Sequence, residues 1–439
     1  MDLNNNVACL PVRMVAIGAG NRMRTYMKYV REHSNEARLV AVIEPDEVRR
    51  NDMADQFGLP AEARFSDYEE YFKAVDNLSS VQGKAAEGVA GVFPLNDALR
   101  ASVAIIATPE DHHFQPTLMA IRRGMHVLLE KPVAQRYEEC EQLASEAREH
   151  GVYIGVCHVL RYMPCFRKVR EVVASGKLGK VVSVRHTERV GIDRQAHSYV
   201  RGVFSDSRKA NPMFLSKCCH DIDFLLWVVQ SPARRVSSFG SLKWFRAENA
   251  PEGSARRCVD CKVEPTCPYS AVDLYWRRRE WISNFDVPAG KSLDEVLQDE
   301  LNEGSFGRCV YHCSNDVVDH QTCIIELADQ TTISIDMTAF TRDDFRSTTI
   351  CLTEGEVYCD ESKVVVKHFR KGTEEVFDFT ESMAAPYHGG ADFLLLDDFL
   401  KAVSGRTDHL SSSIDEALQS HRLCFEAEQS RLTGQVREL

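Results

Sequence analysis

A glycine-rich turn near the N-terminus has residue types that could bind a phosphorylated ligand. It follows an apolar run at residues 12–19, which predicts a buried parallel strand, and it precedes a predicted helix. Gly18 permits a tight turn, and Gly20 lets the backbone approach a pyrophosphate, whose charge a helix N-terminus favours. Met23 stands where the usual fingerprint has a third glycine, so a glycine turn without nucleotide is the alternative. The predicted ligand contacts from this turn are Gly18, Gly20, Asn21 and Arg22.

An acidic residue ends the second predicted strand. Residues 38–44 form an apolar run that finishes on Glu44, 24 residues after Gly20. A carboxylate at this place accepts hydrogen bonds from the adenosine ribose hydroxyls of a dinucleotide and repels a 2′-phosphate. Glu44 therefore favours NAD over NADP, although Arg49 and Arg50 lie close in sequence and leave NADP open.

Polar residues also follow the fourth and fifth predicted strands. Ligands of open α/β sheets bind outside the carboxyl ends of the strands, so a lysine at such an end is predicted to point at the nicotinamide. Pro132 restricts the preceding Lys131 to extended backbone and permits a cis peptide bond. The expected cofactor contacts at these strand ends are Thr108, Pro109, His113, Glu130 and Lys131.

A group of cysteines lies in the second half of the chain. Cys258-x-x-Cys261 has the spacing of a zinc knuckle, and a closed tetrahedral site needs two more ligands. Residues 251–275 hold few large apolar side chains and are not expected to build a hydrophobic core of their own. A cross-link such as a bound metal ion is therefore expected to stabilise them. Ordinary buried thiols are the alternative. We predict one structural zinc ion at Cys258, Cys261, Cys267 and Cys309, with Cys313 as the reserve ligand.

The composition limits the classes of protein to consider. The 439 residues are 44% hydrophobic and 27% charged, which suits two globular domains. The net charge of −12 argues against nucleic acid as the main partner. No run reaches the roughly 18 apolar residues of a transmembrane helix, and no signal peptide is recognised, so no membrane partner is expected. Fifteen cysteines then indicate thiols or metal ligands in a cytoplasmic protein.

The pattern of elements changes near residue 160. Before it, apolar strands alternate with helical patterns, which predicts a doubly wound parallel sheet. After it, polar and apolar residues alternate with period two, which predicts an open, mainly antiparallel sheet. The expected fold class is α/β, with a Rossmann domain at residues 1–157 and an α+β domain at 158–439. Further expectations are strands at 180–190, 331–340, 348–359 and 363–369, a surface loop at 78–93, a cysteine-containing insertion at 245–315 and a C-terminal helix at 413–432.

Short polar motifs run in a fixed order along nearly the whole chain. After the glycine turn they are Glu130-Lys131-Pro132, His158-x-x-Arg161-Tyr162-x-Pro164, Leu178-Gly179-Lys180-Val181, His220-Asp221-Ile222-Asp223, His388-Gly389-Gly390-x-Asp392 and Glu416-x-x-x-Ser420. In order and spacing they resemble the Gfo/Idh/MocA family of oxidoreductases. The resemblance implies hydride transfer between NAD(P) and a secondary alcohol of a sugar, an inositol-like polyol or a sugar acid. It also implies a homodimer or homotetramer that pairs through the open face of the C-terminal sheet.

The resemblance also suggests roles for particular residues. In that family the residues matching Lys131 and His220 serve the alcohol, and a carboxylate usually stands where this chain has Ser216. Hydride leaves a carbinol carbon only as the hydroxyl proton is removed, and histidine has the side chain best suited to that near neutral pH. His220 is thus the expected base, while Lys131 stabilises the alkoxide or exchanges roles with it. The expected substrate contacts are His158, Arg161, His197, Arg201, Ser216 and Lys217.

Two other functions stay open at this point. Some relatives keep NAD bound and hydrolyse glycosides by transient oxidation and elimination, and the missing carboxylate at Ser216 is compatible with that chemistry. A non-catalytic regulator that senses the nucleotide is the third possibility, because one fold supports many functions. The presence of Lys131 and His220 argues against this third function.

Overall fold

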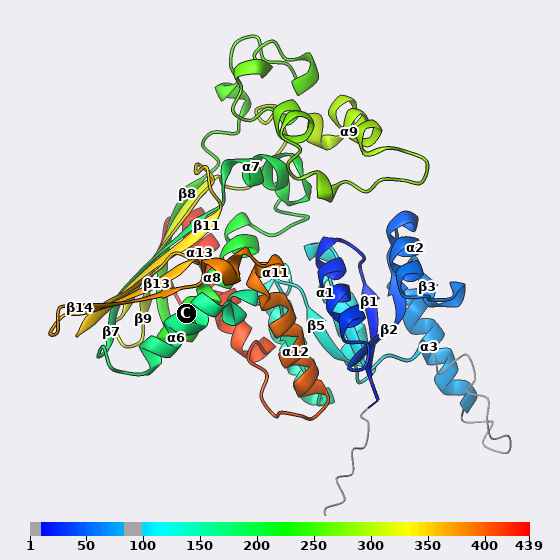
Figure 1. Ribbon diagram of the computed structural model, residues 1–439, viewed down its shortest axis with the longest axis horizontal. Coiled ribbons are helices and arrows are strands. Elements are labelled where there is room, and N and C mark those ends of the chain that lie inside the picture. Colours follow the sequence, from blue (N-terminus) through cyan, green and yellow to red (C-terminus); the bar gives the residue numbers. More distant parts are fainter. Residues whose placement is uncertain (1–9, 83–98) are drawn as a thin grey trace, which may run out of the picture. The chain divides into compact units, whose positions relative to one another are not determined.

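The computed structural model describes residues 10–82 and 99–439, which fold into two compact units (Figure 1). The first unit comprises the chain up to Ala134, Glu138–Cys157 and Asp392–Ile414. The second comprises Gln135–Tyr137, His158–Ala391 and Asp415–Leu439. A unit boundary thus lies at residues 157/158, where the sequence pattern changes, but residues 392–414 pack with the first unit.

The first unit is built on a six-stranded parallel sheet, which confirms the predicted Rossmann architecture. Its strand order is β3-β2-β1-β4-β5-β6. The central strands are continuous apolar runs with almost no exposed surface, as expected where both faces of a parallel sheet are covered. The strands are β1 (Val12–Ile17), β2 (Ala37–Ile43), β3 (Arg64–Phe65), β4 (Val103–Ile106), β5 (His126–Leu129) and β6 (Ile154–Val156). The helices are α1 (Asn21–Glu32), α2 (Glu47–Gln56), α3 (Tyr68–Gln82), α4 (Phe114–Ile121), α5 (Tyr137–His150) and α12 (Ala391–Val403).

One expected loop is partly helical. Residues 78–82 belong to α3, because the chain has no glycine or proline to end that helix before Gly83. The rest of the expected loop, residues 83–93, lies outside the described residues.

The late segment 392–414 joins the first unit through specific contacts. The Val156 backbone N–H donates to the Ser412 carbonyl at 2.8 Å, and Gly155 forms an isolated β-bridge with Ser413. A Cβ atom on Gly155 would lie 2.8 Å from the Phe399 ring, so glycine makes room for α12. These tertiary contacts explain why a boundary based on local pattern misses the segment.

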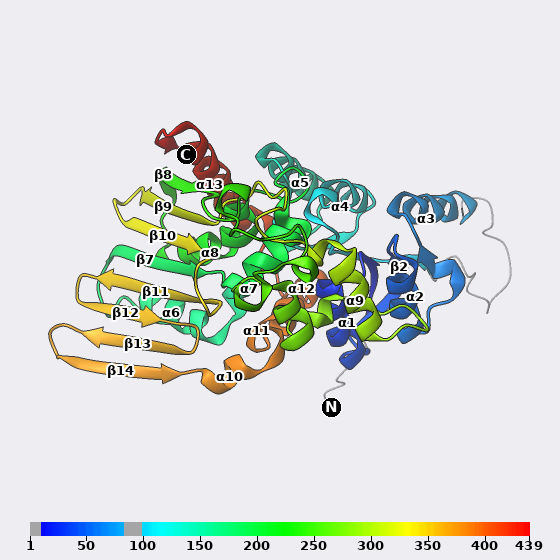
Figure 2. The same cartoon turned by 90° about the horizontal axis from the view of Figure 1, so that it is seen from above.

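The second unit is built on a nine-stranded sheet in the order β14-β13-β12-β11-β7-β10-β9-β8-β15, which Figure 2 shows edge to edge from β8 to β14. Neighbouring strands are antiparallel except β7 and β10, so the predicted mainly antiparallel sheet is confirmed. The strands are β7 (Val181–Arg189), β8 (Ala233–Ser241), β9 (His320–Leu327), β10 (Thr332–Thr338), β11 (Phe345–Leu352), β12 (Gly355–Cys359), β13 (Lys363–His368), β14 (Thr373–Asp378) and β15 (Arg437–Glu438). The long helices of this part are α6 (Pro164–Ala174), α8 (Met213–Val229) and α13 (Ile414–Thr433).

Two sequence expectations for the second unit need correction. The single strand expected at 348–359 is a hairpin of β11 and β12, because the chain turns at Thr353 and Glu354. The insertion at 245–315 has a small apolar cluster, although its early part was expected to lack one. Helix α9 (Leu293–Asn302) supplies the missing partners from later in the sequence. The buried members of the cluster are Cys258, Ala271, Leu274, Tyr275, Leu297 and Leu301.

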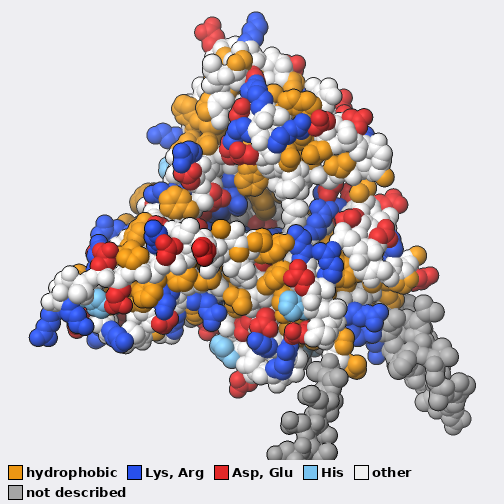
Figure 3. All heavy atoms as spheres, viewed as in Figure 1, with side chains coloured by type: hydrophobic (Ala, Val, Ile, Leu, Met, Phe, Trp, Pro, Cys, Tyr) orange, Lys and Arg blue, Asp and Glu red, His pale blue; other side chains and the backbone are white. Residues whose placement is uncertain are grey.

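The surface and the helices bear on possible partners. Among the helices that the structure describes, none is both long and apolar enough to cross a lipid bilayer. On the face drawn in Figure 3, acidic and basic side chains are interspersed rather than gathered into one basic surface.

Candidate functional site

The glycine turn between β1 and α1 has the geometry of an open anion site. Gly18 has a φ of +90°, and a Cβ atom there would lie 2.5 Å from the Ala107 carbonyl oxygen, so only glycine fits. A Cβ atom on Gly20 would meet nothing within 4 Å. Gly20 is also the N-cap of α1, and no described side chain caps this end of the helix. The exposed Asn21 follows it as the first helical residue. The first amides of α1 can thus bind a pyrophosphate.

Glu44 lies beside this turn. The carboxylate is buried and accepts hydrogen bonds from the backbone N–H groups of Ala19, at 2.7 Å, and Asp46, at 3.1 Å. It therefore joins the end of β2 to the glycine turn. Each carboxylate oxygen has a further lone pair, so Glu44 can also accept a ribose hydroxyl. The Arg50 guanidinium donates to the Glu44 backbone carbonyl at 2.6 Å.

The Arg22 side chain holds together three segments of the first unit. Its Nε donates to Glu130 at 2.6 Å, and its Nη2 donates to Asp392 at 2.6 Å and to the Tyr26 hydroxyl at 2.7 Å. Burial raises the pKa of Glu130, but Arg22 and Tyr26 outweigh burial, and the net pKa is lowered. The ionised pairs fix α1 to the end of β5 and to α12. Sequence reasoning missed Tyr26 and Asp392, although Asp392 lies in one of the quoted motifs.

The ends of β4 and β5 are braced by a histidine. The buried His113 ring places Nδ1 2.7 Å from the Pro132 carbonyl and Nε2 3.1 Å from the Thr108 carbonyl. The Lys131–Pro132 peptide bond is cis, which confirms that sequence expectation. Lys131 is partly exposed, and its backbone N–H donates to Glu130 at 3.1 Å. The exposed Pro109 begins the next short turn, so the structure brings the predicted strand-end residues together.

In the second unit, α8 carries the predicted base within a row of histidines. The His220 ring centroid lies 5.6 Å from that of His158, which in turn lies 5.6 Å from that of His421. His158 is fully buried, and its Nε2 lies 4.0 Å from a carboxylate oxygen of Asp223. His158 therefore contacts the predicted base, whereas we expected it to contact substrate directly.

Arg161 is held by a carboxylate. The guanidinium pairs in bidentate fashion with Asp223, at 2.6 and 2.8 Å, and also lies 3.4 Å from Glu416. Because a planar guanidinium matches a carboxylate in this geometry, the pair fixes the start of the second unit against α8. These contacts give Arg161 a structural partner in addition to its expected role with substrate.

Lys217 belongs to a buried ionic cluster between α8 and the sheet. Its Nζ lies 2.9 Å from Glu188 on β7, and Arg346 on β11 lies 2.9 Å from Glu188 and 2.6 Å from Asp221. Burial raises the pKa of Glu188, although Arg346 and Lys217 oppose this effect. A carboxylate therefore reaches α8 from β7, while position 216 holds a buried serine.

Sequence reasoning missed Glu188 and Arg346. For Glu188 a signal was present: in the alternation of β7, the inward positions Val184, His186 and Glu188 are all buried, and two of them are polar. A polar residue at an inward strand position needs a buried partner. The sequence around its partner, Arg346, shows no comparable pattern.

The stretch that carries the expected substrate contacts His197 and Arg201 is helical in the structure. Residues Gln195–Arg201 form a π-helix after the short α7 (Ile192–Arg194). His197 stacks between Trp281, at 5.0 Å, and Phe306, at 4.6 Å, because its flat ring fills the space between two aromatic rings. Burial, followed by Arg201 and Arg194, lowers the pKa of His197 to about 4. The side chain therefore packs within the insertion as a neutral imidazole.

Arg201 also points into the insertion. Its guanidinium is almost fully buried and donates to the backbone carbonyls of Arg308, at 2.7 Å, and Tyr269, at 2.6 Å. These bonds connect the π-helix to two segments of the insertion. They give Arg201 partners within the protein, whereas we expected it to contact substrate.

The four predicted zinc ligands line one cavity. Cys258, Cys261, Cys267 and Cys309 all border it, whereas the reserve ligand Cys313 does not. The described cysteines are all free thiols. As the side chains stand, however, no group of three or more His, Cys, Asp or Glu residues in the described ranges has an arrangement that could hold a metal ion. The predicted zinc site is therefore not confirmed, because the thiols share a cavity without forming such a group.

Comparisons with known proteins cover both units. Residues 12–158 match the family model described as "Oxidoreductase family, NAD-binding Rossmann fold", and residues 166–260 match the "GFO/IDH/MocA C-terminal domain". The chain is 39% identical over 134 residues to 1,5-anhydro-D-fructose reductase of Ensifer adhaerens, a match that covers 30% of this chain and 39% of the relative. It is 33% identical over 91 residues to 2,7-anhydro-N-acetylneuraminate hydratase of Mediterraneibacter gnavus, which covers 21% of this chain and 24% of the relative. The matched segments thus span well under half of these relatives.

A solved structure resembles the entire chain. The inositol dehydrogenase homologue of Azotobacter vinelandii, complexed with NAD⁺, superposes with a TM-score of 0.68 and covers 100% of both chains. The sequence identity is 15%, so this likeness supports the fold alone.

Proposed function

The chain belongs to the Gfo/Idh/MocA family of oxidoreductases, and from this premise we propose that it transfers a hydride between NAD and a secondary alcohol. The substrate is a sugar, an inositol-like polyol or a sugar acid. The observation that carries the proposal is the uncapped glycine turn at the carboxyl end of β1, on the sheet edge where Lys131 follows β5. Ligands of parallel α/β sheets bind at that edge.

The glycine turn and its neighbours fit the cofactor. Gly18, Gly20 and Asn21 offer backbone amides to the pyrophosphate, and Glu44 accepts ribose hydroxyls. A 2′-phosphate beside the buried Glu44 carboxylate would be repelled, which favours NAD over NADP. When bound, NAD would supply the hydride acceptor. The Arg22 pairs with Glu130 and Asp392 keep the turn in place for it.

Lys131 and His220 are the groups that handle the proton of the substrate hydroxyl. An alcohol gives up its hydride only as that proton leaves, so a positioned base is required. His220 takes the proton. The His158 ring lies beside His220 and close to the Asp223 carboxylate, and the negative charge of Asp223 favours the resulting imidazolium. The Lys131 ammonium stabilises the alkoxide by its charge.

Turnover measurements with matched variants test this proposal. Wild-type protein is screened for production of reduced nicotinamide with NAD and NADP against sugars, inositols and sugar acids. We expect Lys131→Met and His220→Gln to lower kcat by about 10²–10⁴-fold while the Kd for NAD stays near the wild-type value. Lys73→Met, which changes an exposed lysine of α3, serves as the control. Failure of calorimetry to detect either cofactor, or a defect confined to KM, would contradict the proposal.

A redox-neutral reaction on the same scaffold is the second candidate. Two observations favour it. A relative that is 33% identical over 91 residues is named a hydratase, and Ser216 stands where the family usually has a carboxylate. Product analysis by NMR with a trace of NAD separates the two candidates. Many turnovers per NAD without accumulation of reduced nicotinamide would replace the dehydrogenase with an elimination or hydration enzyme.

The open face of the C-terminal sheet supports a proposed homodimer or homotetramer. Paired strands place one continuous row of residues on this face, and several of its apolar side chains are exposed. Ile324 is 56% exposed, Tyr358 38% and Val376 55%. The row consists of Ser237, Ile324, Ser334, Arg185, Thr349, Tyr358, Val365 and Val376.

A further inference from the structure

The fold of the insertion gathers four thiols from distant positions. Arg257 and Arg308 form an isolated antiparallel β-bridge, and the Cys309 backbone N–H donates to the Arg256 carbonyl at 2.9 Å. The bridge brings the segment of Cys309 against the segment of Cys258, and both cysteines line the same cavity. Because this pairing joins segments about fifty residues apart, it is a property of the folded insertion and not of local sequence.

Backbone groups of the insertion lie close to the thiols that line the cavity. The Ala271 N–H donates to Cys258 Sγ at 3.5 Å. The backbone of Tyr269 hydrogen-bonds the Cys267 thiol, and the backbone of Tyr311 hydrogen-bonds the Cys309 thiol. Burial raises the pKa of the Cys267 and Cys309 thiols, and these backbone contacts only partly offset that effect. Loss of the thiol protons therefore depends on binding of the metal ion itself.

A buried cation borders the same cavity. Arg201 is 1% exposed, and among the described residues it pairs with no carboxylate, while its Nη1 has no hydrogen-bond partner. Its Nη2 lies 3.7 Å from Cys258 Sγ. A buried charge without a counter-ion is strongly destabilising. Four thiolates around one divalent ion carry a net negative charge, and this charge would balance the guanidinium.

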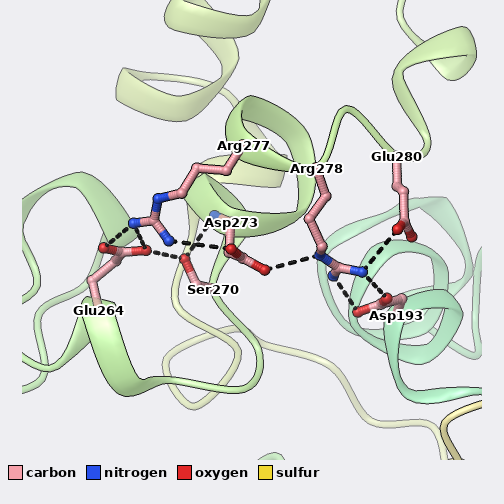
Figure 4. Close-up of polar contacts among 7 residues, drawn as sticks. All are labelled: Asp193, Glu264, Ser270, Asp273, Arg277, Arg278 and Glu280. Carbon is pink, nitrogen blue, oxygen red and sulfur yellow. Dashed lines mark hydrogen bonds and ion pairs between the residues drawn. The ribbon is translucent and has the colours of Figure 1, made fainter.

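Ion pairs hold the cysteine-bearing loop in place (Figure 4). Arg277 binds both oxygens of Glu264, at 2.6 and 2.7 Å, and the Ser270 hydroxyl donates to the same carboxylate. Arg278 binds both oxygens of Asp193, at 2.7 and 2.9 Å. Since Glu264 lies between Cys261 and Cys267, these pairs restrain the loop without using any of the sulfur atoms.

From these contacts we propose that Cys258, Cys261, Cys267 and Cys309 bind one structural zinc ion in the insertion. Zinc forms a bond of about 2.3 Å with each sulfur, the four thiols release their protons to solvent, and no atom changes oxidation state. Rotation of the side chains about χ1 brings the sulfurs from the walls of the cavity onto the ion. Cys313 takes no part, because its thiol donates to the Cys309 carbonyl at 3.3 Å and lies outside the cavity.

Metal analysis with matched variants tests the proposal. Full-length protein is expressed without added zinc, purified without chelator and measured by plasma mass spectrometry. We expect about one zinc ion per chain in the wild type and loss of most of it in Cys258→Ser and Cys309→Ser. Cys313→Ser should keep the wild-type content. Equal zinc in Cys258→Ser and wild type would overturn the proposal.

A spectroscopic measurement covers the case in which the cysteine variants fail to fold. Wild-type protein reconstituted with Co²⁺ without oxygen should show the sulfur-to-cobalt charge-transfer bands of a tetrahedral tetrathiolate. A chelator should also lower its Tm. Absence of zinc from the purified protein together with absence of these bands, or a Cys258–Cys261 disulfide found by mass spectrometry, would refute the site.

Discussion

His197 shows how the direction of a side chain decides what a polar residue does. The imidazole packs between Trp281 and Phe306, and its Nδ1 lies 2.8 Å from the Tyr275 hydroxyl. The sequence places a histidine in a polar stretch before α8, but it does not say on which side of the helix the ring points. For the same reason, Arg161 and Arg201 have protein partners that their motifs do not indicate.

The lowered pKa of His197 makes the stability of the second unit depend on pH. Its pKa falls from 6.5 to about 4 on folding, so the unfolded chain binds a proton in that window while the folded chain does not. Stability is therefore present above pH 6.5 and is lost as the pH falls toward 4, by on the order of 3 kcal/mol. Urea unfolding at several pH values measures the slope.

Two substitutions sharpen the measurement. His197→Gln keeps a hydrogen-bonding side chain that does not titrate, so its stability should change less between pH 6.5 and 4 than that of the wild type. His409→Gln changes an exposed histidine and should retain the wild-type slope. An unchanged slope in His197→Gln would show that another group is responsible.

At the scale of elements, the contact between α8 and the sheet depends on buried ion pairs. Lys217 and Arg346 both pair with Glu188, whose side chain has no exposed surface. Removing one partner of such a pair leaves an uncompensated charge, so Glu188→Gln should destabilise the protein by about 3–5 kcal/mol. Chemical unfolding monitored by circular dichroism measures the loss.

A surface pair and a double variant serve as controls. Lys168→Met breaks the Lys168–Glu171 pair, whose glutamate is 68% exposed, and should cost less than about 1 kcal/mol. Lys217→Met combined with Glu188→Gln removes both charges and should cost less than the sum of Lys217→Met and Glu188→Gln measured singly. Additive losses would mean that Lys217 and Glu188 act independently.

The elements themselves were predictable to the extent that local pattern determines them. The parallel strands are continuous apolar runs, and β7, β10 and β13 alternate clearly, so their positions follow from sequence. The docking of α12 on the first unit depends on Gly155, Phe399 and Ser412, which are far apart in the chain. Contacts between residues so far apart produce no periodic pattern in the sequence, so they could not be predicted from it. The glycine turn was predictable because Gly18, with a φ of +90° beside the Ala107 carbonyl, occupies a position that only glycine can fill.

At the scale of the whole molecule, the exposed face of the nine-stranded sheet leads to a prediction about assembly. Monomeric proteins rarely expose large apolar patches, and the row through Ile324, Tyr358 and Val376 is exposed in the single chain. Interspersed polar residues such as Arg185 and Ser334 give the face the mixed character of a protein interface. Burial of this face between two copies would explain why these apolar side chains are tolerated.

A charge introduced into the row should therefore separate the subunits. In an apolar contact related by two-fold symmetry, Ile324→Asp combined with Tyr358→Asp places like charges close together in a poorly hydrated setting. Light scattering after gel filtration should show an oligomer for the wild type and a monomer for the variant, with the circular dichroism spectrum unchanged. Val203→Asp, which changes a 72% exposed valine away from the strands, should leave the oligomer intact. If the double variant keeps the wild-type mass, the subunits meet elsewhere, because two buried aspartates on each copy cannot be accommodated at an apolar interface.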